Sequence, residues 1–425
     1  MNHETLETKA DLSRICIDLG LDQRQIPEIW QQKWADLQIS DKQPELEILD
    51  SDYLQEMNEF LQLDAASLAA LTQAAELVKS NAGLKALLLV NHVLLYHSDT
   101  EYGGERFTMP EPYKAMANLA GLMPALIILS GLPEMAAYYQ KQAISPDILR
   151  STLSDVRIWM DDYNRKNGRY GLAQYWWLYG HFLGKLFRIG RLQYCYINFY
   201  GSVKAYRQIT GRHVCALSVG GMTYRGDGQV DGTNGMFDRQ NAWTSTLTEQ
   251  DDRIQGYPVT PDGNAQRTPV VLMKDQWREV LAPGMGVLDV HIPEDGRLDH
   301  AACGESIKQA LTFFQTHFPE KQIHAFVCLS WLLDPQLQQI LDESANISRF
   351  QRELYLYPIR SDDKQTFERV FHVVSPDIRQ LNATTNLQKA ILRYIKAGNR
   401  MHAAAMFLLA DDIGSWGRQI YQSQL

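Results

Sequence analysis

The chain has 425 residues, of which 45% are hydrophobic and 21% are charged, which is the composition of a folded globular protein with room for two domains. Its formal net charge is −9, from 50 acidic and 41 basic residues. Because contacts to a nucleic-acid backbone need a basic surface, this balance argues against a nucleic-acid-binding protein and favours an enzyme with small-molecule ligands.

The cysteines and the N-terminus indicate a reducing compartment. The five cysteines are odd in number and none has CxxC spacing, so we expect neither a disulfide framework nor a metal site. The first residues (MNHETLETKADLSR) are polar and charged and lack the apolar core of a signal peptide. We therefore expect a cytoplasmic protein.

Residues 1–188 are predicted to form an all-helical N-terminal domain. Apolar side chains recur at helical spacing between Ser151 and Tyr163, and the run LKALLLVNHVLLY from Leu84 to Tyr96 is typical of a buried helix. An aromatic helix is predicted from Tyr175 to Phe187, ending near Gly190.

One segment of this domain approaches the length of a membrane span. Residues Ala115 to Pro133 (AMANLAGLMPALIILSGLP) carry no charge, but they include Asn118, Pro124 and Gly131. A span needs about 20 strongly apolar residues, so we predict a buried core helix broken near Pro124 and no membrane partner.

After Gly190 the pattern becomes that of short β-strands separated by turns, beginning with LQYCYINFY from Leu192 to Tyr200. The glycine-rich segment from Gly220 to Gly235 lacks the phosphate-binding signature GxxxxGK[ST], and we predict a mobile surface loop. Farther on, the predicted order is strand 287–292, a helix ending near His317, strand 325–329, a short helix from Pro335 and strand 354–359.

These elements predict an α+β protein, with a mixed-sheet C-terminal domain over residues 189–425 and a helical tail. Within the tail, Thr385-x-x-Gln388 has the pattern of a capping box at the start of a helix.

The sequence also resembles a bacterial family in which an N-acyltransferase-type helical N-terminal domain is joined to a GNAT-like C-terminal acyltransferase domain. The resemblance implies an N-acyltransferase that transfers an acyl group from acyl-CoA, its co-substrate, to an amine. It is carried by the segments DVRIWMDDYNRKNGRYG (155–171), FRIGRLQY (187–194), VLAPGMGVLDVHIP (280–293), ACGESIKQALTFFQTHFP (302–319), CLSWLLDPQL (328–337) and SANISRFQREL (344–354).

In GNAT enzymes the fourth strand diverges from the fifth, and the pantetheine arm of acyl-CoA lies between them. The resemblance makes residues 287–292 the fourth strand and implies that the pyrophosphate binds where the next helix begins, at unpaired backbone N–H groups. The family signature, Gln/Arg-x-x-Gly-x-Gly/Ala, is matched at Arg297 and Ala302, whereas His300 replaces a glycine. The predicted anion-binding residues are Arg297, His300, Ala302, Gly304 and Ser306.

Acyl transfer to an amine needs a base for the amine proton and an acid for the leaving thiolate. His291, at the end of the predicted fourth strand, is the first candidate base, and Glu305 is an alternative. Cys328 and Ser330 alternate on the predicted fifth strand, and either is a candidate partner for the acyl sulfur. In GNAT enzymes the acid is usually a tyrosine on the helix after the fifth strand. Here that helix (PQLQQILDE) contains no tyrosine.

Two other functions fit the same residues. One is a GNAT-like domain without catalytic activity that binds a ligand or a partner. The other is a cysteine-dependent enzyme in which Cys328 and His291 form a nucleophilic pair.

Overall fold

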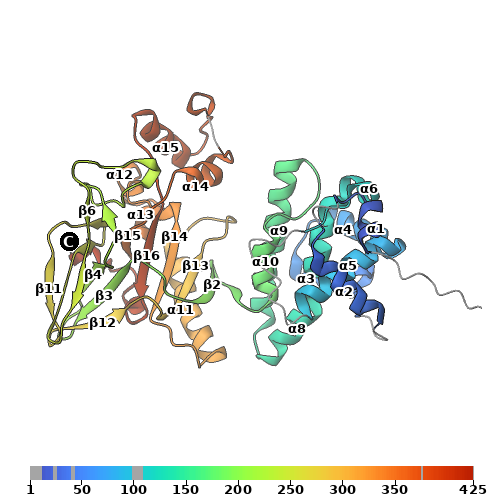
Figure 1. The fold of residues 1–425 in the computed structure, drawn as a ribbon, viewed down its shortest axis with the longest axis horizontal. Helices are drawn as coiled ribbons and strands as arrows, with labels where there is room; N and C mark the ends of the chain where they lie inside the picture. Colours follow the sequence, from blue (N-terminus) through green and yellow to red (C-terminus); the bar gives the residue numbers. More distant parts are fainter. Residues whose placement is uncertain (1–11, 23–25, 40–43, 98–108, 375–376, 425) are drawn as a thin grey trace, which may run out of the picture. The chain divides into compact units, whose positions relative to one another are not determined.

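The computed structural model describes the chain except for residues 1–11, 23–25, 40–43, 98–108, 375–376 and 425. The chain divides into two compact units, Met1–Arg188 and Ile189–Leu425 (Figure 1). The first unit is helical and the second is built on a mixed β-sheet, so the predicted α+β class is confirmed.

Side-chain caps set the starts of several helices in the first unit. Asp50, Asp64, Asn81 and Ser145 each accept a hydrogen bond from a backbone N–H group of the first helical turn. The helices are α1 (Leu12–Asp18), α2 (Glu28–Ile39), η2 (Glu47–Leu49), α3 (Ser51–Leu61), α4 (Ala65–Ser80), α5 (Ala82–Tyr96), α6 (Tyr113–Met116), η3 (Ala117–Leu122), α7 (Met123–Leu129), α8 (Leu132–Lys141), α9 (Pro146–Asn167) and α10 (Tyr175–Phe182).

The long apolar segment belongs to the core of this unit. By length and composition the region Tyr113–Lys141 is apolar enough to cross a membrane, but 83% of its most apolar window is buried inside the structure. It is divided into α6, η3, α7 and α8, with a positive φ of 48° at Ala117. Pro124 lies in the first turn of α7, where its missing N–H is tolerated, so the predicted break near Pro124 is the boundary between η3 and α7.

The aromatic helix α10 is shorter than predicted. It ends at Phe182, and Gly184 follows with a φ of 61° and with the Tyr138 ring against its Cα. A side chain at residue 184 would overlap that ring, so only glycine fits. Residues Leu186–Ile189, predicted to be helical in part, form strand β1.

The central sheet of the second unit has the order β1-β2-β13-β14-β16-β15. Within it β13 and β14 pair in parallel, whereas β2/β13, β14/β16 and β15/β16 pair antiparallel. The strands are β1 (Leu186–Ile189), β2 (Leu192–Asn198), β13 (Gly286–His291), β14 (Ala325–Ser330), β15 (Tyr355–Pro358) and β16 (Ala404–Leu409).

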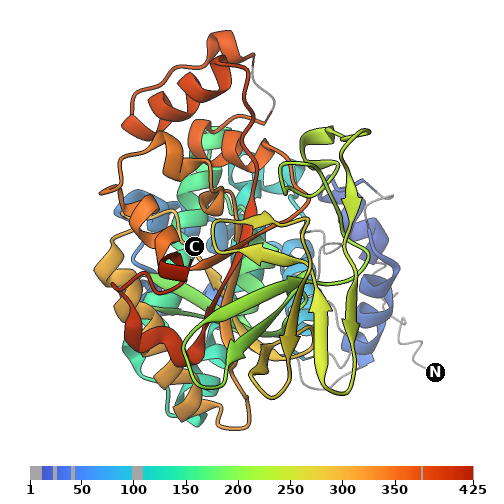
Figure 2. The ribbon, with the colours of Figure 1, turned by 90° about the vertical axis from the view of Figure 1, so that its left-hand side faces the viewer.

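The segment between β2 and β13 forms smaller antiparallel sheets, whose strands lie side by side in Figure 2. Their orders are β10-β9-β4-β3-β12, β11-β8-β7 and β5-β6. The strands are β3 (Val203–Gln208), β4 (Val214–Ser218), β5 (Thr223–Tyr224), β6 (Trp243–Thr244), β7 (Leu247–Glu249), β8 (Arg253–Gly256), β9 (Pro258–Thr260), β10 (Asn264–Ala265), β11 (Val270–Met273) and β12 (Trp277–Leu281), with the short helix η4 (Thr233–Gly235).

The glycine-rich segment 220–235 is only in part the surface loop that the sequence predicts, because Gly220, Gly221 and Gly235 are exposed but other residues are buried. Tyr224 is fully buried, bonds through its hydroxyl to Ser218 and packs its ring on Trp243. Thr233 is also buried. Tyr224 and much of residues 228–233 are therefore packed into the second unit.

The helices of the second unit are α11 (His300–His317), η5 (Trp331–Leu333), α12 (Leu337–Ile340), α13 (Asn346–Arg352), α14 (Lys364–Thr366), η6 (Phe367–Phe371), η7 (Ile378–Gln380), α15 (Asn386–Lys396), η8 (Ala410–Ser415) and η9 (Gln422–Gln424). The capping box predicted at Thr385 and Gln388 is present at the start of α15.

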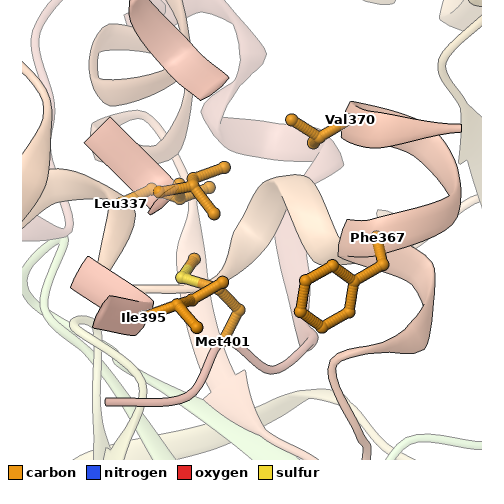
Figure 3. Packing of buried hydrophobic residues seen from close by; sticks show 6 residues of the cluster. Leu337, Phe367, Val370, Ile395 and Met401 are labelled. Carbon is orange, nitrogen blue, oxygen red and sulfur yellow. The ribbon is translucent and has the colours of Figure 1, made fainter. Parts of the chain in front are cut away.

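A separate apolar cluster joins these helices. Figure 3 shows side chains from α12, η6 and α15 meeting at Met401, just before β16. The buried members are Leu337, Phe367, Val370, Ile391, Ile395 and Met401.

Candidate functional site

The parallel strands β13 and β14 stop pairing before either strand ends. Their register runs from Val287 opposite Ala325 to Asp289 opposite Val327. Beyond this point β13 continues to His291 along β2, and β14 continues to Ser330 along β16. The facing edges of the two strand ends therefore lie outside the ladder, with backbone hydrogen-bonding groups directed to the space between them.

A pocket of about 200 Å³ lies where the ladder ends. Its walls come from β13, β14, β15 and β16 and from the loop after β2, and two of its side chains, Tyr200 and Leu329, are 70% and 46% exposed. The lining residues are Phe199, Tyr200, Gly201, Ser202, Met222, Asp289, Val327, Cys328, Leu329, Tyr357, Ile359, Arg360 and Ala405.

Beside this pocket, the β2/β13 pairing brings three reactive side chains together. Asp289 is directly opposite Cys195, and His291 lies two residues farther on the same face of β13. Nε2 of His291 is 3.3 Å from Oδ2 of Asp289 and 3.9 Å from Sγ of Cys195. His291 thus contacts Cys195. Cys328 on β14 lies opposite Met406 in the pairing of β14 with β16.

Both cysteines near the pocket are held as neutral thiols. Burial raises the pKa of Cys195 to about 12; the Asp289 carboxylate adds to this effect and the Lys321 ammonium opposes it. Burial, followed by the charge of Asp289, raises the pKa of Cys328 well above the usual value. Since the thiolate is the nucleophile, neither environment activates a cysteine.

The pocket contains a tyrosine that sequence reasoning missed. Tyr357 on β15 is 4% exposed, and a Cβ at residue 201 would clash with its hydroxyl, so Gly201 makes room for it. Burial raises the pKa of Tyr357 above its usual range, and the nearby groups Tyr200, Asp289 and Cys328 raise it further. The hydroxyl therefore keeps its proton at neutral pH. Strand alternation alone gives no signal that Tyr357 faces a pocket.

Two of the predicted anion-binding residues are exposed at the start of α11. Arg297 lies in the loop before the helix and Ala302 lies in its first turn. Asp299 is the N-cap, and its Oδ1 accepts a hydrogen bond from the Ala302 N–H at 2.8 Å. Glu305 is exposed one turn on and accepts a hydrogen bond from Gln309. The helix start thus presents an arginine, but its capping carboxylate already uses one backbone donor.

The other predicted anion-binding residues are buried. Nε2 of His300 is 3.0 Å from Oε1 of Glu353, and its backbone carbonyl accepts a hydrogen bond from Nε1 of Trp416. A Cβ at residue 304 would overlap the Trp416 indole ring. Gly304 therefore makes room for Trp416. The sequence suggested that its small size exposes the helix backbone to an anion, and this prediction is wrong.

Ser306 and Ser330 both have structural hydrogen bonds. The Ser306 hydroxyl donates to the carbonyl of Ile189 and accepts from the N–H of Leu192 at 3.2 Å, which fixes the β1–β2 turn. The Ser330 hydroxyl accepts from the N–H of Leu332 at 3.1 Å and caps η5.

Arg191 holds the loop between β13 and α11. Its Nε donates to the carbonyl of Arg297 at 2.8 Å, and its Nη2 donates to the carbonyls of Pro293 and Gly296 at 2.9 and 3.0 Å. Three bonds from one rigid guanidinium fix the path of this loop toward the helix start. The sequence places Arg191 in a turn and gives no sign of this function.

This strand order, with its parallel pair followed by a helix, is accompanied by a family match. Residues 186–408 match the GNAT-like C-terminal domain, and residues 52–184 match the N-acyltransferase N-terminal domain. The chain belongs to the family of the GNAT-like C-terminal domain, which confirms the predicted resemblance.

Several solved structures share the fold over nearly the whole chain. A crystal structure of an acyltransferase in complex with decanoyl-CoA has 21% identity and a TM-score of 0.64, and the alignment covers 94% of this chain and 99% of that one. An acyltransferase complex with decanoyl-CoA and teicoplanin has 21% identity, the same coverage and a TM-score of 0.63. Among curated proteins there is no match.

Proposed function

We propose that this protein is an acyl-CoA-dependent N-acyltransferase, with the pantetheine arm bound between the diverging ends of β13 and β14. The observation that carries the proposal is the parallel ladder that ends at Asp289 and Val327 while both strands continue. An extended amide-containing chain such as pantetheine satisfies backbone groups of this kind in the manner of an added strand. The crystallised acyltransferases of the same fold, with acyl-CoA bound, support the assignment.

The proposed reaction is direct transfer. The amine nitrogen attacks the thioester carbonyl, the C–S bond of the tetrahedral intermediate breaks, and the sulfur leaves as a thiolate. His291 takes the amine proton, and the Asp289 carboxylate at 3.3 Å stabilises the resulting imidazolium. Backbone N–H groups at the strand edge are the donors available to the developing oxyanion.

Tyr357 is the proposed proton donor to the departing thiolate. It lines the pocket near Asp289 and Cys328, as Tyr200 does, but it is buried whereas Tyr200 is 70% exposed, and burial keeps it protonated at neutral pH. A covalent acyl-cysteine route is less well supported, because burial keeps Cys195 and Cys328 in the unreactive thiol form.

The acceptor is proposed to be an amine-bearing small molecule, and the net charge of −9 favours a cationic one. A glycopeptide belongs in the test set because the acyltransferase of the same fold was crystallised with teicoplanin. The anion site is proposed at Arg297 and the first turn of α11, and we expect the reaction to take place in the cytoplasm.

The experiment has two stages. Calorimetric titration of the tag-free chain with CoA, acetyl-CoA and decanoyl-CoA measures donor binding. Release of free CoA thiol, followed with a thiol reagent over a panel of amines, measures turnover. His291→Ala should lower kcat by about 100-fold or more with little change in KM for acyl-CoA. His372→Asn, at an exposed turn with a φ of 57°, is the matched control.

Each negative result in these experiments leads to a different conclusion. A folded protein that binds none of the CoA species contradicts the proposal at its first step. Binding without thiol release in any acceptor supports the alternative of a ligand-binding GNAT-like protein without catalytic activity. Equal losses of activity and melting temperature in His291→Ala would assign His291 a structural role at the strand end.

A further inference from the structure

A second cluster of metal-ligand side chains lies in the helical unit, within residues Met1–Arg188 and outside the site described above. His92 is in the last turns of α5, His97 is the C-cap of the same helix, and Glu134 is in the first turn of α8. Nε2 of His92 and Nε2 of His97 are 3.1 Å apart, and Oε1 of Glu134 is 3.0 Å from His97 and 3.7 Å from His92.

These separations match those of ligands around one small cation. At zinc–ligand distances of about 2.0–2.1 Å, two ligand atoms of a tetrahedral site lie roughly 3.3 Å apart. The three measured separations, 3.0, 3.1 and 3.7 Å, fall on both sides of that value. Two imidazoles and one carboxylate are also a ligand set that zinc takes in proteins, with the fourth position left to water.

The hydrogen bond between His92 and Ser130 fixes the His92 tautomer that can bind a metal ion. Its Nδ1 is 2.9 Å from Oγ of Ser130, and that hydroxyl donates its own proton to the carbonyl of Ile127 at 2.7 Å. Ser130 must then accept a hydrogen bond from Nδ1–H of His92, so Nε2 carries the lone pair and points to the cluster. His92 and Ser130 are 2% and 3% exposed, so this tautomer is fixed by a buried bond.

Without a cation, the cluster has too few protons for its acceptors. When neutral and protonated at Nε2, His97 offers one N–H to two acceptors, Nε2 of His92 and Oε1 of Glu134. In addition, Oε2 of Glu134 is buried and has no hydrogen-bond partner in the described structure. A divalent cation removes the first shortage because it takes a lone pair from each of the three side chains, and the water in its fourth position is a proton donor for Oε2.

The surrounding contacts hold the ligands in place. Tyr96, between the two histidines in sequence, donates its hydroxyl proton to the carbonyl of Ile128 at 2.7 Å, and its ring covers Gly131. The side chains of His97 and Glu134 are 42% and 34% exposed, so an ion and its water can enter from solvent.

From this geometry we propose that His92, His97 and Glu134 bind one divalent cation of the zinc class, with a water in the fourth position. The ion fastens the C-terminal end of α5 to the start of α8. The sequence-based prediction of no metal site rested on the spacing of the cysteines. That criterion does not apply to a site built from histidines and a carboxylate.

The test uses the tag-free full-length chain, dialysed against a chelator and then titrated with Zn²⁺, with metal content per chain measured after desalting. We expect one zinc per chain, binding at least 100-fold weaker in His97→Ala and in Glu134→Gln, and binding 10- to 100-fold weaker in Ser130→Ala, which removes only the outer hydrogen bond. Glu76→Gln, at an exposed position of α4, is the matched control and should bind as wild type does.

Circular dichroism and a melting curve confirm that each variant is folded before its affinity is compared. Three results would overturn the proposal: a folded wild-type chain that takes up no stoichiometric zinc, unchanged binding in the His97→Ala Glu134→Gln double variant, or loss of the bound zinc in Cys195→Ser. The last would place the ion at the cluster of Cys195, Asp289 and His291.

Discussion

Replacing Gly304 with alanine tests what positions the start of α11. The structure has no room for a Cβ at this position because the Trp416 indole ring lies against the helix there. Trp416 also donates a hydrogen bond to the carbonyl of His300 at 3.0 Å and packs on Phe350 at a ring separation of 5.9 Å. Gly304→Ala should therefore push the indole ring away and loosen the first turn of the helix.

The size of the effect follows from three contributions. Displacing a packed ring costs about 1–3 kcal/mol, and losing the bond to the His300 carbonyl costs about 1 kcal/mol. Alanine recovers roughly 0.5–1 kcal/mol because it is the better helix former. We expect the free energy of unfolding to fall by about 1–3.5 kcal/mol, although the helix propensity alone predicts a gain.

A double-mutant cycle with Trp416→Ala, measured by urea unfolding, isolates this contact. In the Trp416→Ala background, Gly304→Ala should be neutral or stabilising, because the ring that it meets is absent. Additive effects of the two substitutions, or a stabilised single Gly304→Ala variant, would refute the packing role. A large loss of CoA affinity in a Gly304→Ala variant of unchanged stability would restore the anion-approach role suggested by the sequence.

The remaining predictions concern the loop, the core and the cysteines. Arg191→Ala should weaken CoA binding by about tenfold in calorimetry. Arg191→Lys should not restore the affinity, because an ammonium lacks the planar fork that reaches three carbonyls. Wild-type affinity for CoA in both variants would contradict this prediction. Asp412→Asn removes the charge paired with buried Arg207 and should lower the free energy of unfolding by about 3–5 kcal/mol. A change below about 1 kcal/mol would show that the ion pair is not needed for stability. The Cys195→Ser Cys328→Ser double variant should keep at least half of the wild-type kcat, and a loss of about 100-fold would favour an acyl-cysteine route. With a pKa of about 12, Cys195 should be alkylated by iodoacetamide at a rate that still rises above pH 9, whereas a plateau near the usual thiol pKa would show an unperturbed thiol.

Local pattern was sufficient to predict much of the second unit. The apolar runs of β13, β14 and β15, the amphipathic repeat of α11 and the capping box of α15 each lie within a short window of sequence. Strand β16 was missed because AAMFLL is a short apolar run that fits a buried helix as well as a strand. Its identity depends on pairing with β14 and β15, which are remote in sequence.

The site was harder to predict than the fold. Alternation places His291 near the end of its strand, but its contact with Cys195 depends on the β2/β13 register across 96 residues of separation. The environment of Gly304 is set by Trp416, which comes from the C-terminal end of the chain. Likewise, the space for the Tyr357 hydroxyl depends on Gly201, which comes from the loop after β2. Contacts of this kind are properties of the tertiary structure, and no local motif encodes them.

The central claim is that acyl-CoA enters the second unit between β13 and β14. A crystal structure of the protein with decanoyl-CoA tests it directly. We predict that the pantetheine amides bond to backbone groups of β13 and β14 beyond Asp289 and Val327, with the thioester beside Tyr357 and the phosphates near Arg297. Ordered decanoyl-CoA elsewhere on the protein, with these strand ends unoccupied, would contradict the account.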